Sequence, residues 1–171
     1  MKDLIKKILK EESKGEYILE IPNLSFIPNA DLTSSKGKTN AWNELLRLLN
    51  GKPFIFDGYL NLKLTDIISL GNLQSVNGKL DLFGCDQLTS LGNLQSVNGI
   101  LDLSGCKNLT SLGNLQSVDG HLGLYGCDQL TSLGNLQSVG GDLDLARTPI
   151  SKKYSEEEIR QMVHVEGDLL I

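Results

Sequence analysis

The chain has 171 residues, of which 40% are hydrophobic and 22% charged, a composition ordinary for one soluble globular domain. Its formal net charge of -5 argues against non-specific nucleic-acid binding, which depends on clustered lysine and arginine, and favours a partner that is itself basic. No apolar run is long enough to span a bilayer, and the lysines among residues 1–14 leave no apolar core for a secretion signal. We therefore expect a cytoplasmic protein that makes no membrane contact.

Residues 1–53 carry none of the repeats found further along, and we expect them to form an N-terminal capping region of two helices and a strand. The first helix is predicted from apolar residues at helical spacing, at Leu4, Ile5, Ile8 and Leu9. A strand through Leu19 and Ile21 is ended by Pro22, and residues 23–38 are predicted to be a loop. The second helix is expected to start at Thr39 or Asn40, to run through Trp42 and Leu49, and to end at Gly51.

A repeat of 21 residues dominates the rest of the chain. Segments 69–89, 90–110 and 111–131 are almost identical, and a fourth copy starts at residue 132 and loses one residue after Leu145. Weaker copies lie at 56–62 and 165–171. The glycines that mark the copies are residues 58, 78, 99, 120, 141 and 167. We therefore expect a solenoid of about six rungs over residues 54–171.

Each copy contains two apolar periods. Val76, Gly78, Leu80 and Leu82 alternate, which predicts one face of a β-strand. Apolar residues then recur every third position from Leu88 to Val97, which favours a tight, extended or 3₁₀-like return path. A unit of this size cannot bury its apolar side alone, so neighbouring copies must stack, with their strands in register as a parallel sheet.

The segment Leu80-x-Leu82-x-x-Cys85-x-x-Leu88, which recurs at 101–109 and 122–130, resembles the signature of the leucine-rich repeat superfamily. The leucine usual three residues upstream is absent, and a valine followed by glycine gives a V-x-G-x-L-x-L form, similar to the repeats of receptor L domains. This resemblance implies an α/β solenoid: a right-handed, leucine-rich-repeat-like parallel β-solenoid with an N-terminal cap. Because such families bind many unrelated ligands, it does not indicate the target.

The C-terminal part departs from the repeat over residues 151–162. Ser155 and Glu158 form a capping-box pattern, which predicts a short helix before the last strand. The strand is expected at 165–171, with no capping segment after it. Because an uncovered strand edge can pair with another chain, we expect a homodimer or another edge-mediated partner there.

If the alternating apolar residues point inward, the residues between them form three outward columns. The first column is Tyr59, Lys79, Ile100, His121, Asp142 and Asp168; the second is Asn61, Asp81, Asp102, Gly123, Asp144 and Leu170; the third is Lys63, Phe83, Ser104, Tyr125 and Ala146. The first and third columns change chemistry at nearly every copy, whereas the inward positions hardly change. We interpret this face as a binding face with aromatic anchors; the alternative is unselected variation on a solvated surface. The expected contact residues are Tyr59, Lys79, Asp81, Phe83, Ile100, Asp102, His121, Tyr125, Asp142 and Asp144.

Other chemistry finds little support in the sequence. The stacked aspartates Asp81, Asp102 and Asp144 favour a solvated acidic strip over a flat calcium site. Cys85, Cys106 and Cys127 are expected to be buried, reduced thiols rather than disulfide partners. No phosphate loop, nucleophile elbow or paired-carboxylate motif is present, so we expect no catalytic residue, cofactor or metal.

Two functions follow from these patterns. The first is a non-enzymatic interaction module that recognises a protein through the strand face, the N-terminal cap or both. The second is an inhibitor encoded by a phage or mobile element, of the anti-CRISPR type, that acts in the host cytoplasm and blocks a nucleic-acid-binding defence nuclease. In that case the acidic columns would compete with a nucleic-acid backbone, without direct binding of nucleic acid by the chain itself.

Overall fold

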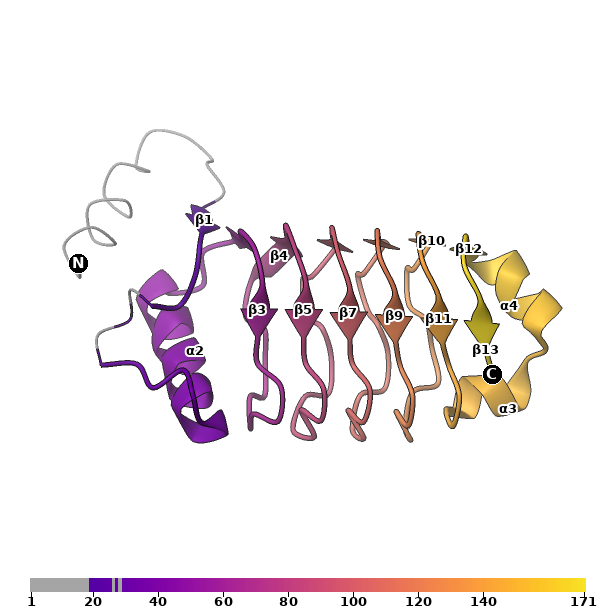
Figure 1. Ribbon diagram of the computed structural model, residues 1–171, viewed down its shortest axis with the longest axis horizontal. Coiled ribbons are helices and arrows are strands. Elements are labelled where there is room, and N and C mark those ends of the chain that lie inside the picture. The colour runs from indigo at the N-terminus through magenta and orange to yellow at the C-terminus, as the bar shows by residue number, and fades with distance from the viewer. Residues whose placement is uncertain (1–18, 26, 28) are drawn as a thin grey trace.

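The computed structural model describes residues 19–25, 27 and 29–171, so the apolar stripe predicted at residues 4–9 lies outside the described part. The chain forms a parallel β-solenoid (Figure 1), with helix α2 (Ser35–Leu49) at one end and helices α3 (Pro149–Lys153) and α4 (Glu156–Met162) at the other. None of the helices in the described part is long and apolar enough to cross a membrane.

The strands of the described residues form two parallel sheets that share the turns of the solenoid. The seven-stranded sheet contains β1 (Leu19–Ile21), β2 (Phe54–Phe56), β4 (Leu73–Val76), β6 (Ser96–Val97), β8 (Ser117–Val118), β10 (Ser138–Val139) and β12 (His164–Val165). The six-stranded sheet contains β3 (Leu60–Asn61), β5 (Leu80–Asp81), β7 (Leu101–Asp102), β9 (Leu122–Gly123), β11 (Leu143–Asp144) and β13 (Leu169–Leu170). Within the repeats the same positions face each other, as in Val76 with Val97 and Leu80 with Leu101.

The prediction of one strand through Val76–Leu82 is therefore wrong, because the chain bends at Gly78 and enters a second sheet. Glycine is required at this corner because the backbones of neighbouring turns approach each other closely there. A Cβ placed on Gly99 would lie 2.8 Å from the carbonyl carbon and oxygen of Gly78. The same close approach recurs between Gly120 and Gly99. Only a residue without a side chain fits between backbones at this distance.

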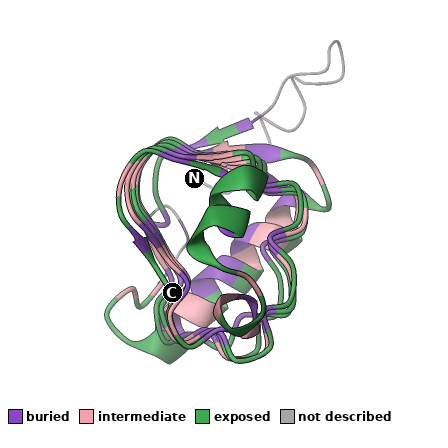
Figure 2. Cartoon of the chain, turned by 90° about the vertical axis from the view of Figure 1, so that its right-hand side faces the viewer, coloured by how far each residue is buried: buried purple, intermediate pink, exposed green. Residues whose placement is uncertain are grey.

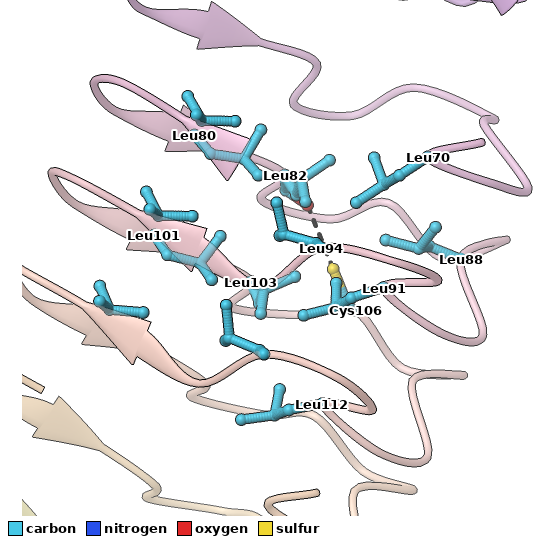
Figure 3. Packing of buried hydrophobic residues seen from close by; sticks show 14 of the residues in the cluster. Leu70, Leu80, Leu82, Leu88, Leu91, Leu94, Leu101, Leu103, Cys106 and Leu112 are labelled. Atoms are coloured by element: carbon cyan, nitrogen blue, oxygen red, sulfur yellow. Dashed lines mark hydrogen bonds between the residues drawn. The ribbon is translucent and has the colours of Figure 1, made fainter. Parts of the chain in front are cut away.

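The interior is filled by the leucines that the two periods predict. Leu80, Leu82, Leu88, Leu91 and Leu94 are fully buried, and Figure 3 shows them pointing inward from the strands and from the return path. The return path is a series of turns joined by isolated parallel bridges, Ser90 to Ser111 and Ser111 to Ser132. Each turn thus repeats the packing of the one before it, and a column of leucines runs along the solenoid.

The described N-terminal region packs against the first turn. Strand β1 pairs with β2 and extends the seven-stranded sheet, as the alternation at Leu19 and Ile21 predicts. Helix α2 buries Trp42, whose ring centroid lies 5.9 Å from that of Phe54. The helix starts earlier than predicted: Ser34, not Thr39 or Asn40, is the N-cap, and its hydroxyl accepts the N–H of Gly37 at 3.0 Å. Part of the predicted loop is therefore helical.

At the other end, α4 has the predicted capping box at Ser155 and Glu158. Helix α3, whose N-cap is Thr148, is an additional element. Figure 2 shows both helices lying across the end of the solenoid, where they bury Ile150, Ile159 and Val163. The interior is thus covered by helices that precede the last strands, and the segment expected as one strand bends into β12 and β13. The homodimer through residues 165–171 stays a prediction.

All three cysteines are free and buried, as predicted. Each thiol donates to a leucine carbonyl of the preceding turn at 3.1 Å, as Cys106 does to Leu82 in Figure 3. Threonines take the same position in the flanking turns: Thr65 donates to Leu62 at 2.5 Å and Thr148 to Leu145 at 2.7 Å. The slot therefore needs a small side chain with a donor rather than a reactive thiol.

Native protein is expected to resist alkylation at all three cysteines. Burial raises the pKa of the Cys127 thiol to about 12 and also raises the pKa values of Cys85 and Cys106, so the reactive thiolate is scarce at pH 8. Iodoacetamide followed by mass spectrometry should label none of them in the folded chain and all three in guanidinium. Labelling of even one cysteine without denaturant would contradict this arrangement.

Candidate binding face

The outward columns lie on the outer surface of the six-stranded sheet, here called the strand face (β3 to β13 in Figure 1). Five large apolar or aromatic side chains on it are exposed: Tyr59 (54%), Phe83 (44%), Ile100 (40%), Tyr125 (41%) and Leu170 (51%). The first four alternate between the first and the third column on successive turns, and Leu170 ends the second column. The strand face therefore carries large exposed side chains at different positions of a regular parallel sheet.

The neighbouring seven-stranded sheet provides an internal comparison. Its partly or fully exposed positions hold the same residues in every full copy, namely Gln74, Gln95, Gln116 and Gln137 with Ser75, Ser96, Ser117 and Ser138. Both sheets belong to the same turns and share one core. Between the two sheets, the change of chemistry from copy to copy is therefore concentrated on the strand face.

At the N-terminal end of this face, Tyr59, Lys79 and Asp81 form one cluster. The Tyr59 hydroxyl donates to Asp81 Oδ2 at 3.2 Å, and Lys79 Nζ lies 3.5 Å from the same oxygen and 5.6 Å from the Tyr59 ring centroid. Partial desolvation of the hydroxyl, together with the Asp81 carboxylate, raises the pKa of Tyr59 although the residue is more than half exposed. Asp81 is only 5% exposed. The expectation that Asp81 belongs to a solvated strip is therefore wrong, because Tyr59 and Lys79 contact its carboxylate; its role as a partner contact stays a prediction.

The aspartates of the second column have a structural role that sequence reasoning missed. Asp102 Oδ1 accepts the N–H of Ser104 at 3.0 Å, and Asp144 Oδ1 accepts that of Ala146 at 2.9 Å. Asn61 and Asp81 make the same contact with the residue two positions on, at 3.3 Å. An Asp or Asn side chain that accepts the N–H two residues further on forms an Asx turn, which explains why Asp or Asn recurs at the end of these strands. In the described part of the chain, no group of three or more His, Cys, Asp or Glu side chains is arranged to hold a metal ion.

Two residues beside the third column have an unusual backbone. Gly84, Gly105 and Gly126 have φ between 66° and 72°, and the flanking turns place Leu64 (φ 57°) and Arg147 (φ 61°) at the same position. A bulky residue in this left-handed region costs about 1–3 kcal/mol, and such residues gather at functional sites. Leu64 is exposed, and the Arg147 guanidinium lies 5.2 Å from the Tyr125 ring centroid. Leu64 and Arg147 thus add large side chains to the strand face next to its third column, beyond the carboxyl ends of the strands.

In the first column, side chains of one turn bind the backbone of the next. His121 Nδ1 accepts the N–H of Asp142 at 2.9 Å, and Asp142 Oδ1 accepts the N–H of Asp168 at 2.9 Å. Ile100 lies one turn earlier in the same column. Acidic side chains thus gather toward the C-terminal end of the face, whereas Tyr59, Phe83 and Ile100 lie toward its N-terminal end.

A cavity of about 200 Å³ lies where the N-terminal region meets the strand face. Leu24, Leu32, Phe56 and Leu60 supply its apolar lining, and Lys38, Tyr59 and Asn61 supply polar groups. Lys38 Nζ donates to Asn61 Oδ1 at 3.1 Å. The two surfaces expected to bind a partner, the strand face and the N-terminal region, therefore adjoin at this cavity.

Comparison of the chain with protein families, with curated proteins and with solved structures found no match.

Proposed function

We propose that this chain is a non-catalytic binding module whose strand face recognises a protein partner. The observation that carries the proposal is the contrast between the two sheets within the four full copies: Gln and Ser are constant on one, whereas on the other the first column reads Lys, Ile, His, Asp and the third reads Phe, Ser, Tyr, Ala. Large exposed apolar patches on a rigid, flat support are typical of interaction surfaces.

For the scaffold, we propose a right-handed solenoid of the leucine-rich-repeat type, closest to receptor L domains, with about six rungs. The L-x-L-x-x-C-x-x-L pattern and the buried cysteine slot support this class. We propose further that residues 1–53 cap the N-terminal end, which the packing of Trp42 against Phe54 supports.

Within the strand face, Phe83 and Tyr125 are the proposed aromatic anchors. They lie in the same column two turns apart, with the small residue Ser104 between them. Their backbones are thus separated by about two strand spacings, roughly 9–10 Å. Aromatic side chains contribute much of the energy at protein interfaces because they bury a large area at low cost in side-chain entropy.

The acidic end of the face supports a basic partner. Asp102, Asp142 and Asp144 are partly exposed, and Asp168 is exposed. This charge is also the observation that favours the second candidate, an inhibitor of the anti-CRISPR type, in which these carboxylates would occupy the basic nucleic-acid site of a nuclease. The two candidates differ in what they displace: only the inhibitor would release bound nucleic acid from its partner.

Replacing Phe83 or Tyr125 by alanine is expected to weaken partner binding by roughly tenfold or more, because removal of a central aromatic anchor costs about 2 kcal/mol. The partner is first identified by affinity capture with mass spectrometry and purified. Its Kd is then measured by calorimetry for the wild type, for Phe83→Ala and for Tyr125→Ala.

Gln95→Ala on the neighbouring sheet is the matched control, and it should leave Kd unchanged. The melting temperatures of all variants should stay close to that of the wild type because these side chains are exposed. If neither aromatic variant weakens binding, the strand face is the wrong surface. Adding the chain to a preformed complex of the partner with nucleic acid decides between the two candidates.

A further inference from the structure

The Nδ1 atom of His121 has two neighbours that require opposite protonation states. It accepts the backbone N–H of Asp142 at 2.9 Å, and it lies 3.1 Å from Oδ2 of the same residue. A ring nitrogen can accept a hydrogen bond only without a proton, and it can donate to a carboxylate only with one. The two contacts therefore cannot both be favourable in one protonation state.

The Asp142 carboxylate is held in place independently of this histidine. Its Oδ1 accepts the N–H of Asp168 at 2.9 Å, which leaves Oδ2 facing the imidazole. The His121 side chain is 56% exposed and that of Asp142 is 44% exposed, so the exchanging proton comes directly from solvent. Protonation can thus occur without any rearrangement of the solenoid.

The other groups around His121 leave Asp142 as its charged contact. Along the first column the preceding turn supplies Ile100, which is uncharged, and Lys79 follows one turn further away. In the second column Asp102 belongs to the preceding turn and Asp144 to the following one. Asp119 lies at the corner two residues before His121. The carboxylates outnumber the cations here, so a proton on His121 lowers the negative charge of this part of the strand face by one.

We propose that His121 and Asp142 form a proton-operated contact on the strand face. Neutral His121 accepts the Asp142 N–H and leaves the carboxylate free for a basic group of the partner. Protonated His121 donates to that carboxylate instead and occupies it. Histidine is the side chain that makes such a change near neutral pH. The link to binding rests on the proposed function: a basic partner should bind several-fold more weakly to the form in which His121 is protonated.

The contact itself is tested on the free chain by NMR, with His164, which is exposed on the other sheet, as the internal control. The ¹⁵N shifts of neutral His121 should show Nδ1 without a proton, and the Asp142 amide proton should shift with the same midpoint as the His121 ring. An imidazole protonated at Nδ1 above the midpoint, or an Asp142 amide that ignores the titration, would overturn the proposal.

His121→Asn supplies the matched variant, because its side-chain oxygen can still accept the Asp142 N–H but cannot titrate. In this variant the Asp142 amide should keep its downfield position and lose the shift that follows the imidazole in the wild type. A shift that persists over that same pH range in the variant would show that another group causes it, and would also overturn the proposal. With the purified partner, a Kd that does not change with pH while the NMR contact is present would overturn the link to binding and leave the binding face itself intact.

Discussion

Truncation of Leu101 to alanine is expected to lower the free energy of unfolding by about 2–5 kcal/mol, because it leaves a cavity in a fully buried site. Leu101 lies in β7 and faces Leu80 on one side and Leu122 on the other, so the cavity adjoins two turns. In a solenoid each turn is stabilised chiefly by its two neighbours, and a defect in a central turn therefore weakens both interfaces.

Leu169 is the matched control, since it has the same position in the repeat and its strand, β13, pairs with β11 in the described chain. Its truncation should cost clearly less than that of Leu101. Urea unfolding followed by far-UV circular dichroism measures both values under the same conditions. Equal losses for the two variants would contradict the view that stability comes from stacking between adjacent turns.

The inward positions of the solenoid were predictable because stacking makes every turn bury the same residues. Leu88, Leu91 and Leu94, together with the cysteine slot, follow directly from that constraint. Helix α4 was predictable for a different reason: Ser155 and Glu158 interact within one helical turn, so the signal is local.

The bend at Gly78 was not predictable from alternation. Val76, Leu80 and Leu82 point inward whether the backbone continues as one strand or turns a corner, and the pattern does not distinguish the two. The deciding fact is the approach of Gly99 to the backbone of Gly78, which is a contact between turns. Helix α3 could have been found from Thr148 and Pro149, an N-cap followed by proline at the start of a helix.

The candidate site was predicted only in outline. Alternation places Asp81 on the outer face, but its burial depends on Tyr59 from the preceding turn and on Lys79, and no periodicity reports that. Leu64 and Arg147 carried a signal that alignment of the copies reveals, because both replace a glycine that the three central turns keep. The contact between His121 and Asp142 also joins two turns and needs coordinates to be seen.

Substitution of Gly99 by alanine is the second change with a large expected effect, a loss of about 1–3 kcal/mol, the usual cost of forcing an extra carbon into a filled site. The new Cβ would lie 2.8 Å from the carbonyl carbon and oxygen of Gly78 and 3.1 Å from the Lys79 nitrogen. These are backbone atoms, and hydrogen bonds between the turns on either side of them, from Asn98 N–H to Val76 and from Leu80 N–H to Ile100, keep them from moving aside alone.

Gly123→Ala separates this steric effect from the general effect of replacing a glycine. Its Cβ would meet Ser104 Oγ at 2.9 Å, the end of a side chain that can rotate away, and Asp102 Oδ1 at 3.2 Å, which need shift by only a few tenths of an ångström. Neither Gly99 nor Gly123 has a positive φ. Urea unfolding should therefore give a clearly smaller loss for Gly123→Ala than for Gly99→Ala. If the two losses are equal, the turns do not depend on backbone contact at the glycine column, and the bend between the two sheets must have another cause.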